Sequence, residues 1–387
     1  MVRQRLPRSG LPVRCPRSRG AGGALGPGRV TAVTQVVDHQ KEDVRKAVDA
    51  ILHDFFDVQE SQAQTAELKI FTDVLREIIA AGGKRIRPVL CVTGWQAISE
   101  TPVPPVVYRL AASLELFHAF ALIHDDIMDN SATRRGRPAA HRVLSALHPG
   151  HHDRETLGRN AGILLGDLAL GWSYDLLRHP ETEGWALPWD LLNTMRTETL
   201  TGQYLDLSCA RQAGQPDIEA SWQVIRYKTA RYTFERPLQL GALLAGATRA
   251  QQQALAAYAA PVGEAFQLRD DLLGVFGNPD ETGKPTLDDL REGKRTVLVA
   301  TAWSAASDAD RASLARLLGD PELGDAQAEE VREILIATGA VDTVESLIEQ
   351  RRHAALAALA ALDGASLMRG AADRLRQIAA AATSRTA

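Results

Sequence analysis

Carboxylates gather at two places in this 387-residue chain, where they could hold a hard metal ion. The first cluster is Asp125-Asp126-Ile127-Met128-Asp129, and the second is Gln267-Leu268-Arg269-Asp270-Asp271. Both lie in otherwise apolar stretches, where neighbouring carboxylates repel one another and resist burial unless a cation joins them. Oxygen ligands favour Mg²⁺, which keeps several waters and shares phosphate oxygens. The two clusters therefore suggest the two walls of a magnesium-dependent diphosphate site.

The first cluster has the spacing of a metal site on one face of a helix. Asp125 and Asp129 are four residues apart and project from the same side, with Asp126 turned about 100° away. Arg134 and Arg135 follow closely, and guanidinium groups bind phosphate oxygens through two hydrogen bonds. The alternative is a solvated helix end with ordinary ion pairs, and the second cluster argues against it.

Lysines and arginines also occur in two glycine-containing segments. Lys284 lies between a glycine and a proline, and Lys294 follows a glycine, a composition typical of a lid over a phosphate. The segment Gly82–Pro88 gathers three cations after two glycines that end a helix. Lys84 and Arg87 would share one side if a helix restarts there, which suggests a second anion site. Solvated surface charges are the alternative for both segments.

The elements that must position these residues are predicted to be helices. Apolar residues recur at spacings of three and four from about Val36 onward, and alternating runs with hairpin turns are missing. The predicted helices are Val44–Phe56, Leu68–Ile79, Val106–Ile127, Leu157–Leu177, Leu187–Leu207, Trp222–Tyr232, Leu255–Val275, Val297–Leu318, Ala328–Ile336 and Val344–Leu362. Hydrophobic residues make up 45% of the chain, enough for a large core. We expect a large all-α bundle in a single domain, with the clusters facing a central cavity.

Composition excludes several other classes of protein. The net charge of −4 does not suggest nucleic acid as a partner. Cys15, Cys91 and Cys209 are too few and too scattered for a disulfide framework or a zinc site. No apolar run reaches the length of a membrane span. A cytoplasmic location is expected.

Residues 1–35 differ from the rest and are predicted to form a disordered tail. Seven arginines are interleaved with proline and glycine there, and no acidic residue precedes Asp38. A transit peptide is one alternative, and a mis-assigned start with initiation at a codon such as Val30 is another. The remaining residues, 36–387, are expected to form the functional domain.

The ordered set of motifs resembles that of the trans-isoprenyl diphosphate synthases, the polyprenyl synthetase family, over roughly residues 40–380. The matching motifs are Gly83-Lys84-Arg85-Ile86-Arg87-Pro88, Leu122-Ile123-His124-Asp125-Asp126-Ile127-Met128-Asp129, Arg134-Arg135-Gly136, Gly202-Gln203, Lys228-Thr229, Phe266-Gln267-Leu268-Arg269-Asp270-Asp271 and Gly293-Lys294-Arg295-Thr296. The resemblance implies an isoprenoid-synthase helical fold and a homodimer. It also implies a transferase that condenses isopentenyl diphosphate head-to-tail with dimethylallyl, geranyl or farnesyl diphosphate, through a Mg²⁺-assisted allylic cation.

The resemblance also implies a role for each site residue. About three Mg²⁺ ions would be held by Asp125, Asp126, Asp129, Asp270 and Asp271. The allylic diphosphate would be clamped by Arg134, Lys228 and Lys294, and isopentenyl diphosphate by Lys84, Arg87, His118 and Arg135. Thr229 and Gln267 would stabilise the cation, and Lys284 would close over the phosphates. For His118, an ordinary core histidine is the alternative.

The chain departs from the family at Gly274, where the second motif usually carries a third acid. Asp270 and Asp271 are left to hold that side, and Asp280 on the following loop could compensate. The departure keeps open a weakly active or regulatory partner subunit of a synthase. A class I terpene cyclase is the other alternative, but it has no use for the second anion site.

Product length can be predicted from the helix that carries the first cluster. Phe120 lies five residues before Asp125, about 7.5 Å deeper along the helix, and Phe117 lies one turn below it. In the family, a bulky aromatic residue at this position beside a small one such as Ala121 goes with a floor near C20. We therefore predict geranylgeranyl diphosphate as the product, with farnesyl diphosphate second. Ordinary core packing is the alternative role of both phenylalanines.

Overall fold

The computed structural model describes residues 27–210, 214–277, 287–362 and 367–383. The chain divides into two compact units, Met1–Gln40 and Lys41–Ala387. Helix α1 (Pro27–Gln62) begins in the first unit and continues into the second. Most of the predicted tail, residues 1–26, lies outside the described residues, so the boundary at residue 35 stays a prediction.

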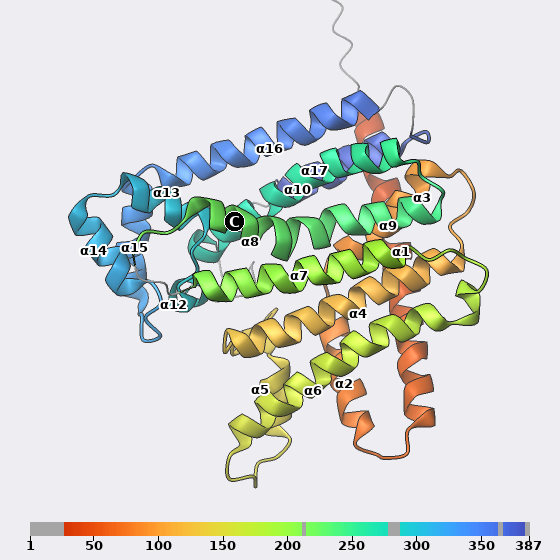
Figure 1. Cartoon of the computed structure of the whole chain (residues 1–387), viewed down its shortest axis with the longest axis horizontal. Coiled ribbons are helices and arrows are strands. Elements are labelled where there is room, and N and C mark those ends of the chain that lie inside the picture. Colours follow the sequence, from red (N-terminus) through yellow and green to blue (C-terminus); the bar gives the residue numbers. More distant parts are fainter. Residues whose placement is uncertain (1–26, 211–213, 278–286, 363–366, 384–387) are drawn as a thin grey trace, which may run out of the picture. The chain divides into compact units, whose positions relative to one another are not determined.

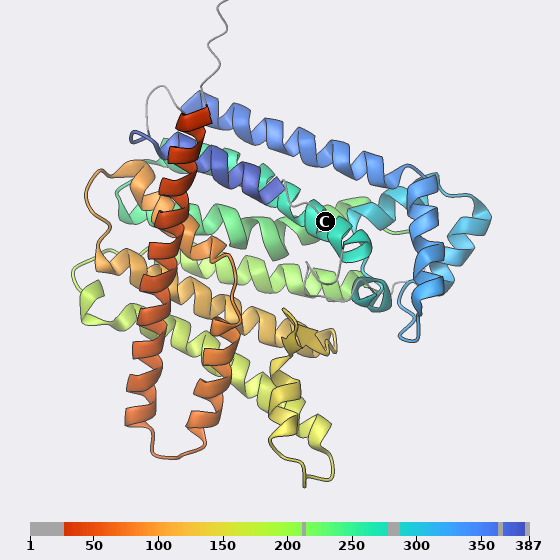
Figure 2. The ribbon, with the colours of Figure 1, turned by 180° about the vertical axis from the view of Figure 1, so that it is seen from behind.

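The second unit consists almost entirely of helices in its described part, which confirms the all-α prediction (Figures 1 and 2). After α1 the helices are α2 (Leu68–Ala80), α3 (Ile86–Ile98), α4 (Pro105–Met128), α5 (Ala140–Ala146), α6 (Arg154–Asp175), η1 (Leu176–Arg178), η2 (Pro180–Thr182), α7 (Trp189–Cys209), α8 (Ile218–Val224), η3 (Ile225–Glu235), α9 (Arg236–Leu244), α10 (Arg249–Phe276), α12 (Asp288–Glu292), α13 (Val297–Ala305), α14 (Asp308–Leu317), α15 (Asp325–Ala337), α16 (Ala340–Leu362) and α17 (Ala371–Thr383).

The long predicted helices are all present, and the differences have local causes. The predicted helix Val297–Leu318 is broken into α13 and α14 because Ser307 starts a new helix, accepting a hydrogen bond from the backbone of Asp310. The predicted helix Trp222–Tyr232 runs from α8 into η3, which is a π-helix. Apolar periodicity in the sequence does not reveal the wider turn of a π-helix. The prediction missed α3, α9 and α17, in which glycine, proline or alanine weakens the apolar pattern, and also the short helices α5 and α12.

One short hairpin lies among the helices, with strands too short to form the alternating runs that the sequence lacks. Strands β1 (Thr133–Arg134) and β2 (Arg137–Pro138) pair in antiparallel fashion across a two-residue turn. Both turn residues, Arg135 and Gly136, have left-handed backbone angles, with φ of 54° and 72°. Such a turn matches the twist of a tight hairpin, and it is too short to leave an alternating pattern in the sequence.

Helix α4 runs through the main core and packs against α3 and α6. Among the described helices, α4 alone is long and apolar enough to cross a membrane by length and composition, so the expectation that no apolar run reaches this length is wrong. However, 72% of its most apolar stretch of 18 residues is buried within the protein, as in a core helix. On the other side of the bundle, α10 packs against η3 and α16. The two acidic clusters therefore lie on α4 and α10, which pack mainly against different helices.

Candidate active site

The first acidic cluster lies at the carboxyl end of α4. Asp125 and Asp126 belong to its last turn, and Asp129 caps it, with its backbone N–H donating to the carbonyl of Asp125 over 2.9 Å. The carboxyl end of a helix carries the negative end of its dipole. Three carboxylates therefore add to a field that is already negative, and nearby cations are needed to hold them there.

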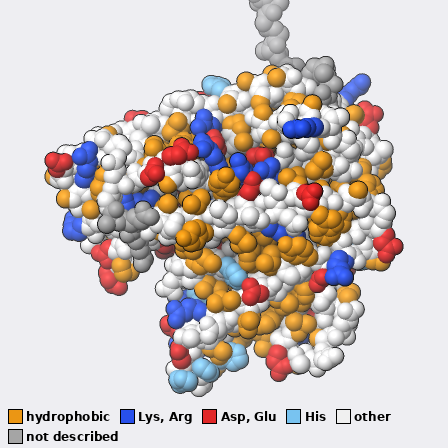
Figure 3. Space-filling view, in the orientation of Figure 1, with side chains coloured by type: hydrophobic (Ala, Val, Ile, Leu, Met, Phe, Trp, Pro, Cys, Tyr) orange, Lys and Arg blue, Asp and Glu red, His pale blue; other side chains and the backbone are white. Residues whose placement is uncertain are grey.

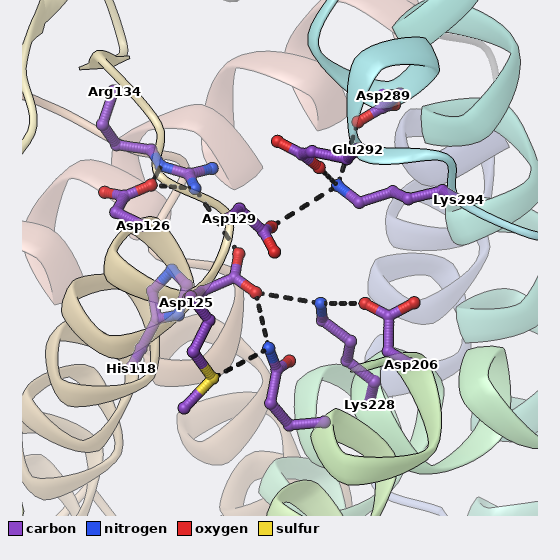
Figure 4. A network of polar contacts seen from close by, with 12 residues as sticks. His118, Asp125, Asp126, Asp129, Arg134, Asp206, Lys228, Asp289, Glu292 and Lys294 are labelled. Carbon is purple, nitrogen blue, oxygen red and sulfur yellow. Dashed lines mark hydrogen bonds and ion pairs between the residues drawn. The ribbon is translucent and has the colours of Figure 1, made fainter. Parts of the chain in front are cut away.

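Lys228 supplies one of these cations. Its Nζ donates to Asp125 Oδ1 over 2.9 Å and to Asp206 Oδ2 over 2.6 Å, and Gln203 Nε2 also donates to Asp125 Oδ1 over 3.0 Å (Figure 4). Burial raises the pKa of Asp125, but the charges of Lys228 and Lys294 outweigh burial and hold the pKa well below its usual range. Asp125 is therefore an anion at any working pH.

Close packing of α7 against η3 brings Lys228 to this position. The two helices meet at Gly202, where an added Cβ would run into the backbone nitrogen of Lys228 and approach the carbonyl carbon of Tyr227 to 2.6 Å. A larger residue would push η3 away and withdraw the lysine from Asp125. Glycine at residue 202 therefore allows the close approach of α7 and η3 that places Lys228 beside Asp125.

Arg134 and Lys294 compensate the other two carboxylates of α4. Arg134 Nε donates to Asp126 Oδ1 over 2.8 Å, and Asp126 is only 3% exposed. Lys294 Nζ lies 3.8 Å from Asp129 Oδ2 and 2.6 Å from Glu292 Oε2. Burial and the charge of Asp125 raise the pKa of Asp129. Each acid of the first cluster thus faces a cation from a different element.

A second group of cations gathers around the Gly82–Pro88 segment. The β1–β2 turn directs the Arg135 guanidinium to the carbonyl oxygen of Gly82, which it contacts as a donor. Arg87 lies 4.0 Å over the ring of Tyr232 and donates to Thr233 Oγ1 over 2.7 Å. Two chain segments therefore supply the positive charge of this second site.

Two neighbours define this second site further. His118 Nδ1 lies 2.6 Å from the Tyr232 hydroxyl, and burial, helped by the charge of Arg87, lowers the pKa of His118 well below its usual value. His118 is therefore neutral near pH 7. Arg85 also lines the cavity but is held in two ion pairs, each 2.8 Å long: a buried one with Glu115 and a partly buried one with Asp49. It acts as a structural residue.

The second acidic cluster lies on α10. Asp271 is 9% exposed and accepts a hydrogen bond of 2.8 Å from Gln267 Nε2. Burial raises the pKa of Asp271 to about 7, and the charges of Asp289 and Asp270 add to this shift. The two acids and Gln267 line the same cavity as Asp125.

The cavity between these helices has a volume of about 890 Å³. The predicted site residues that line it are Lys84, Arg87, His118, Phe120, Ala121, Asp125, Arg134, Arg135, Lys228, Thr229, Gln267, Asp270, Asp271 and Lys294. Asp126, Asp129 and Phe117 do not line it. Lys284 and Asp280 lie outside the described residues. Most of the residues selected from the sequence thus meet at one cavity.

The donor set fits a hard divalent cation. Asp125 and Asp270 face the cavity from two helices with oxygen atoms alone, the ligands that Mg²⁺ prefers. Within the described part of the chain, no three acidic, histidine or cysteine side chains already converge on one point. The acids of the first cluster are instead paired with lysine and arginine. A metal bound here would take part of its coordination from substrate oxygens.

Four residues of the site were missed by sequence reasoning. Asp206 binds Lys228, Tyr232 binds His118, and Asp289 and Glu292 bind Lys294. The spacing of Gln203 and Asp206 along a predicted helix could have indicated Asp206. The acidic residues just before Gly293 could have indicated Asp289 and Glu292.

Comparison with known proteins identifies similar sequences and structures. The family model for polyprenyl synthetases matches residues 68–335. A short chain isoprenyl diphosphate synthase of Methanocaldococcus jannaschii is 31% identical over 288 residues, which cover 72% of this chain and 83% of that protein. A geranylgeranyl diphosphate synthase of Saccharolobus solfataricus is 30% identical over 274 residues, which cover 70% and 77%.

Solved structures agree with the sequence comparison. The structure of geranylgeranyl pyrophosphate synthase from Corynebacterium glutamicum, complexed with isoprenyl diphosphate and magnesium, superimposes with a TM-score of 0.83 at 39% identity. The match covers 89% of this chain and 99% of that one.

Proposed function

Since the chain belongs to the polyprenyl synthetase family and is a prenyltransferase, we propose that it makes geranylgeranyl diphosphate by adding isopentenyl diphosphate to shorter allylic diphosphates. The observation that carries this proposal is one cavity with two cationic sites. Lys228, Arg134 and Lys294 surround the acids of α4, and Lys84, Arg87 and Arg135 form the other site. A condensation of two diphosphates needs both.

The first cationic site is suited to a leaving diphosphate. Lys228, Arg134 and Lys294 are now paired with carboxylates, and they can exchange carboxylate oxygens for phosphate oxygens without leaving the site. When bound, Mg²⁺ would neutralise the charge that develops on the diphosphate as the allylic C–O bond breaks. Asp125, Asp126 and Asp129 on one side and Asp270 and Asp271 on the other are the residues that would hold it, as about three ions.

The remaining residues act on the cation and on the second substrate. Thr229 and Gln267 line the cavity, where their oxygen atoms would stabilise the allylic cation. Lys84, Arg87 and Arg135 would hold isopentenyl diphosphate so that its C4 carbon attacks this cation and forms the new C–C bond. Loss of a proton to the released diphosphate would then complete the reaction.

Two features of the cavity wall support a defined product length, for which C20 is our proposal. Phe120 and Ala121 line the cavity, whereas Phe117 packs behind Phe120 with ring centroids 5.4 Å apart. Phe120 is held further by an edge contact with His124, 4.9 Å between centroids. A rigid aromatic wall supports a defined product length. Farnesyl diphosphate is the second candidate.

An exposed apolar surface supports a homodimer. Tyr204, Leu200 and Leu207 on α7 and Leu164 and Ile163 on α6 are exposed, Tyr204 at 69%. Figure 3 shows hydrophobic side chains gathered on the face where these helices lie. Exposed apolar surface of this kind is typical of protein–protein contacts. We propose that the partner is a second copy of the chain. We also propose that the protein is located in the cytoplasm.

The experiment that tests the proposed function supplies the purified chain with Mg²⁺, labelled isopentenyl diphosphate and the C5, C10 or C15 allylic primer. The expected result is a series of labelled allylic diphosphates that ends at C20. Label that stays in isopentenyl diphosphate while the primer becomes a hydrocarbon would indicate a terpene cyclase. No turnover of either substrate would indicate a partner subunit.

A further inference from the structure

Asp289 occupies the space that a side chain at residue 274 would fill. A Cβ built on Gly274 would run into Asp289 Oδ2 and lie 3.0 Å from its Cγ. Gly274 is four residues after Asp270 and three after Asp271, so a residue there shares the face of α10 that carries both acids. The carboxylate of Asp289 therefore lies beside the second cluster, although it comes from another helix.

The fold holds Asp289 in this position. Helix α12 is anchored by Leu290, which is 1% exposed and whose carbonyl accepts a hydrogen bond of 2.8 Å from Gly319. Gly293 ends the helix with a left-handed φ of 68°, which turns the chain back so that Lys294 Nζ donates to Asp289 Oδ1 over 3.0 Å. Oδ1 thus faces the lysine, while Oδ2 faces Gly274.

The surroundings of Asp289 belong to the diphosphate site. Asp289, Gly274 and Asp270 line the cavity, as does Lys294. Figure 4 shows Asp289 beside Lys294, which reaches toward Asp129 of the first cluster. A carboxylate here lies between the two acidic walls.

We infer that Asp289 supplies the third carboxylate of the second acidic wall, and that Gly274 is the vacancy that admits it. This inference rests on the proposed function, because it assigns Asp289 to the Mg²⁺ that the diphosphate shares. It changes how the missing acid is interpreted. The second wall keeps three carboxylates, two from α10 and one from α12, and the chain is a complete enzyme rather than a weakened one.

Lys294 offers a competing role for Asp289, which would then only position the lysine. The two roles differ in their dependence on metal. Loss of a metal ligand weakens binding of a diphosphate only when Mg²⁺ is present, whereas a misplaced lysine weakens it with or without the metal. Lys294 also keeps Glu292, 2.6 Å away, when Asp289 is neutralised.

The test measures Mg²⁺-dependent binding of an unreactive thiolo analogue of dimethylallyl diphosphate by calorimetry, across a series of Mg²⁺ concentrations and in EDTA. Asp289→Asn is expected to raise the half-saturating Mg²⁺ concentration at least about tenfold, the usual effect of losing a supporting metal contact. Affinity in EDTA should be unchanged. Asp288→Asn is the matched control, since it removes the same charge from α12 at a residue that does not line the cavity.

A relocation variant makes the test independent of small folding defects. Asp289→Gly combined with Gly274→Asp moves the carboxylate onto α10 and is expected to restore the Mg²⁺ response that Asp289→Gly loses. An unchanged Mg²⁺ response in Asp289→Asn, or an equal loss of affinity in EDTA, would overturn the inference. Failure of the proposed function is distinguishable, because the unaltered chain would then neither bind the analogue with Mg²⁺ nor transfer label.

Discussion

Replacement of Phe120 by alanine tests whether this residue sets the length of the product. Phe120 lines the cavity, and Phe117 lies three residues behind it on α4, about 4.5 Å deeper by helical rise. Removal of the Phe120 ring therefore extends the cavity by about the length of one C5 unit. We expect the main product to lengthen from C20 to C25, and further in a variant that also carries Phe117→Ala.

The same change has a cost in stability. A buried phenylalanine replaced by alanine typically lowers the free energy of unfolding by about 3–5 kcal/mol. Phe120 borders a cavity, so we expect the free energy of unfolding to fall by about 3 kcal/mol, the lower end of this range. Phe56→Ala is a suitable control, because this ring is equally buried in the core but does not line the cavity.

The assay separates the labelled products by chain length and records thermal unfolding of the same preparations. Phe120→Ala should lengthen the product, whereas Phe56→Ala should lower the unfolding temperature and leave C20 as the end point. A Phe120→Ala enzyme that is destabilised but still stops at C20 would refute the reasoning, since Phe120 would then be an ordinary core residue.

Three further changes test the account. Lys228→Met should lower kcat/KM about 100- to 1000-fold by removing a fixed charge beside Asp125, and a loss below tenfold would contradict its role. Tyr232→Phe removes the hydroxyl that binds His118 and should raise KM for isopentenyl diphosphate about fivefold, with kcat unaltered in steady-state assays. Burial lowers the pKa of His141 to about 4, so the unfolded chain gains its proton first as pH falls. His141 alone should therefore lower the free energy of unfolding by about 2 kcal/mol from pH 7 to pH 5, and in urea titrations His141→Leu should remove this contribution from the pH dependence of the unaltered chain.

The parts of the site that sequence reasoning predicted are those in which local chemistry fixes geometry. Asp125 and Asp129 share a helix face by spacing alone, and Arg134 follows them so closely that it must lie nearby. The helical fold was predictable for the same reason, since apolar periodicity acts over a few turns. The prediction of product length likewise uses residues of one helix, such as Phe120.

Long-range contacts were beyond a single sequence. Tyr232 is 114 residues from His118, and only the packing of η3 against the rest of the bundle joins them. The partnership of Gly274 with Asp289 likewise depends on how α12 folds back onto α10. The absence of a side chain at Gly274 suggested a lost function from sequence alone, whereas in space it makes room for another carboxylate.

A crystal structure of the chain with Mg²⁺, the thiolo analogue and isopentenyl diphosphate tests the central claim most directly. The account predicts the allylic diphosphate between the acids of α4 and α10, contacted by Lys228, and the second diphosphate on Lys84 and Arg87. Both substrates on one side of the cavity, or a second cationic site that takes no diphosphate, would contradict it.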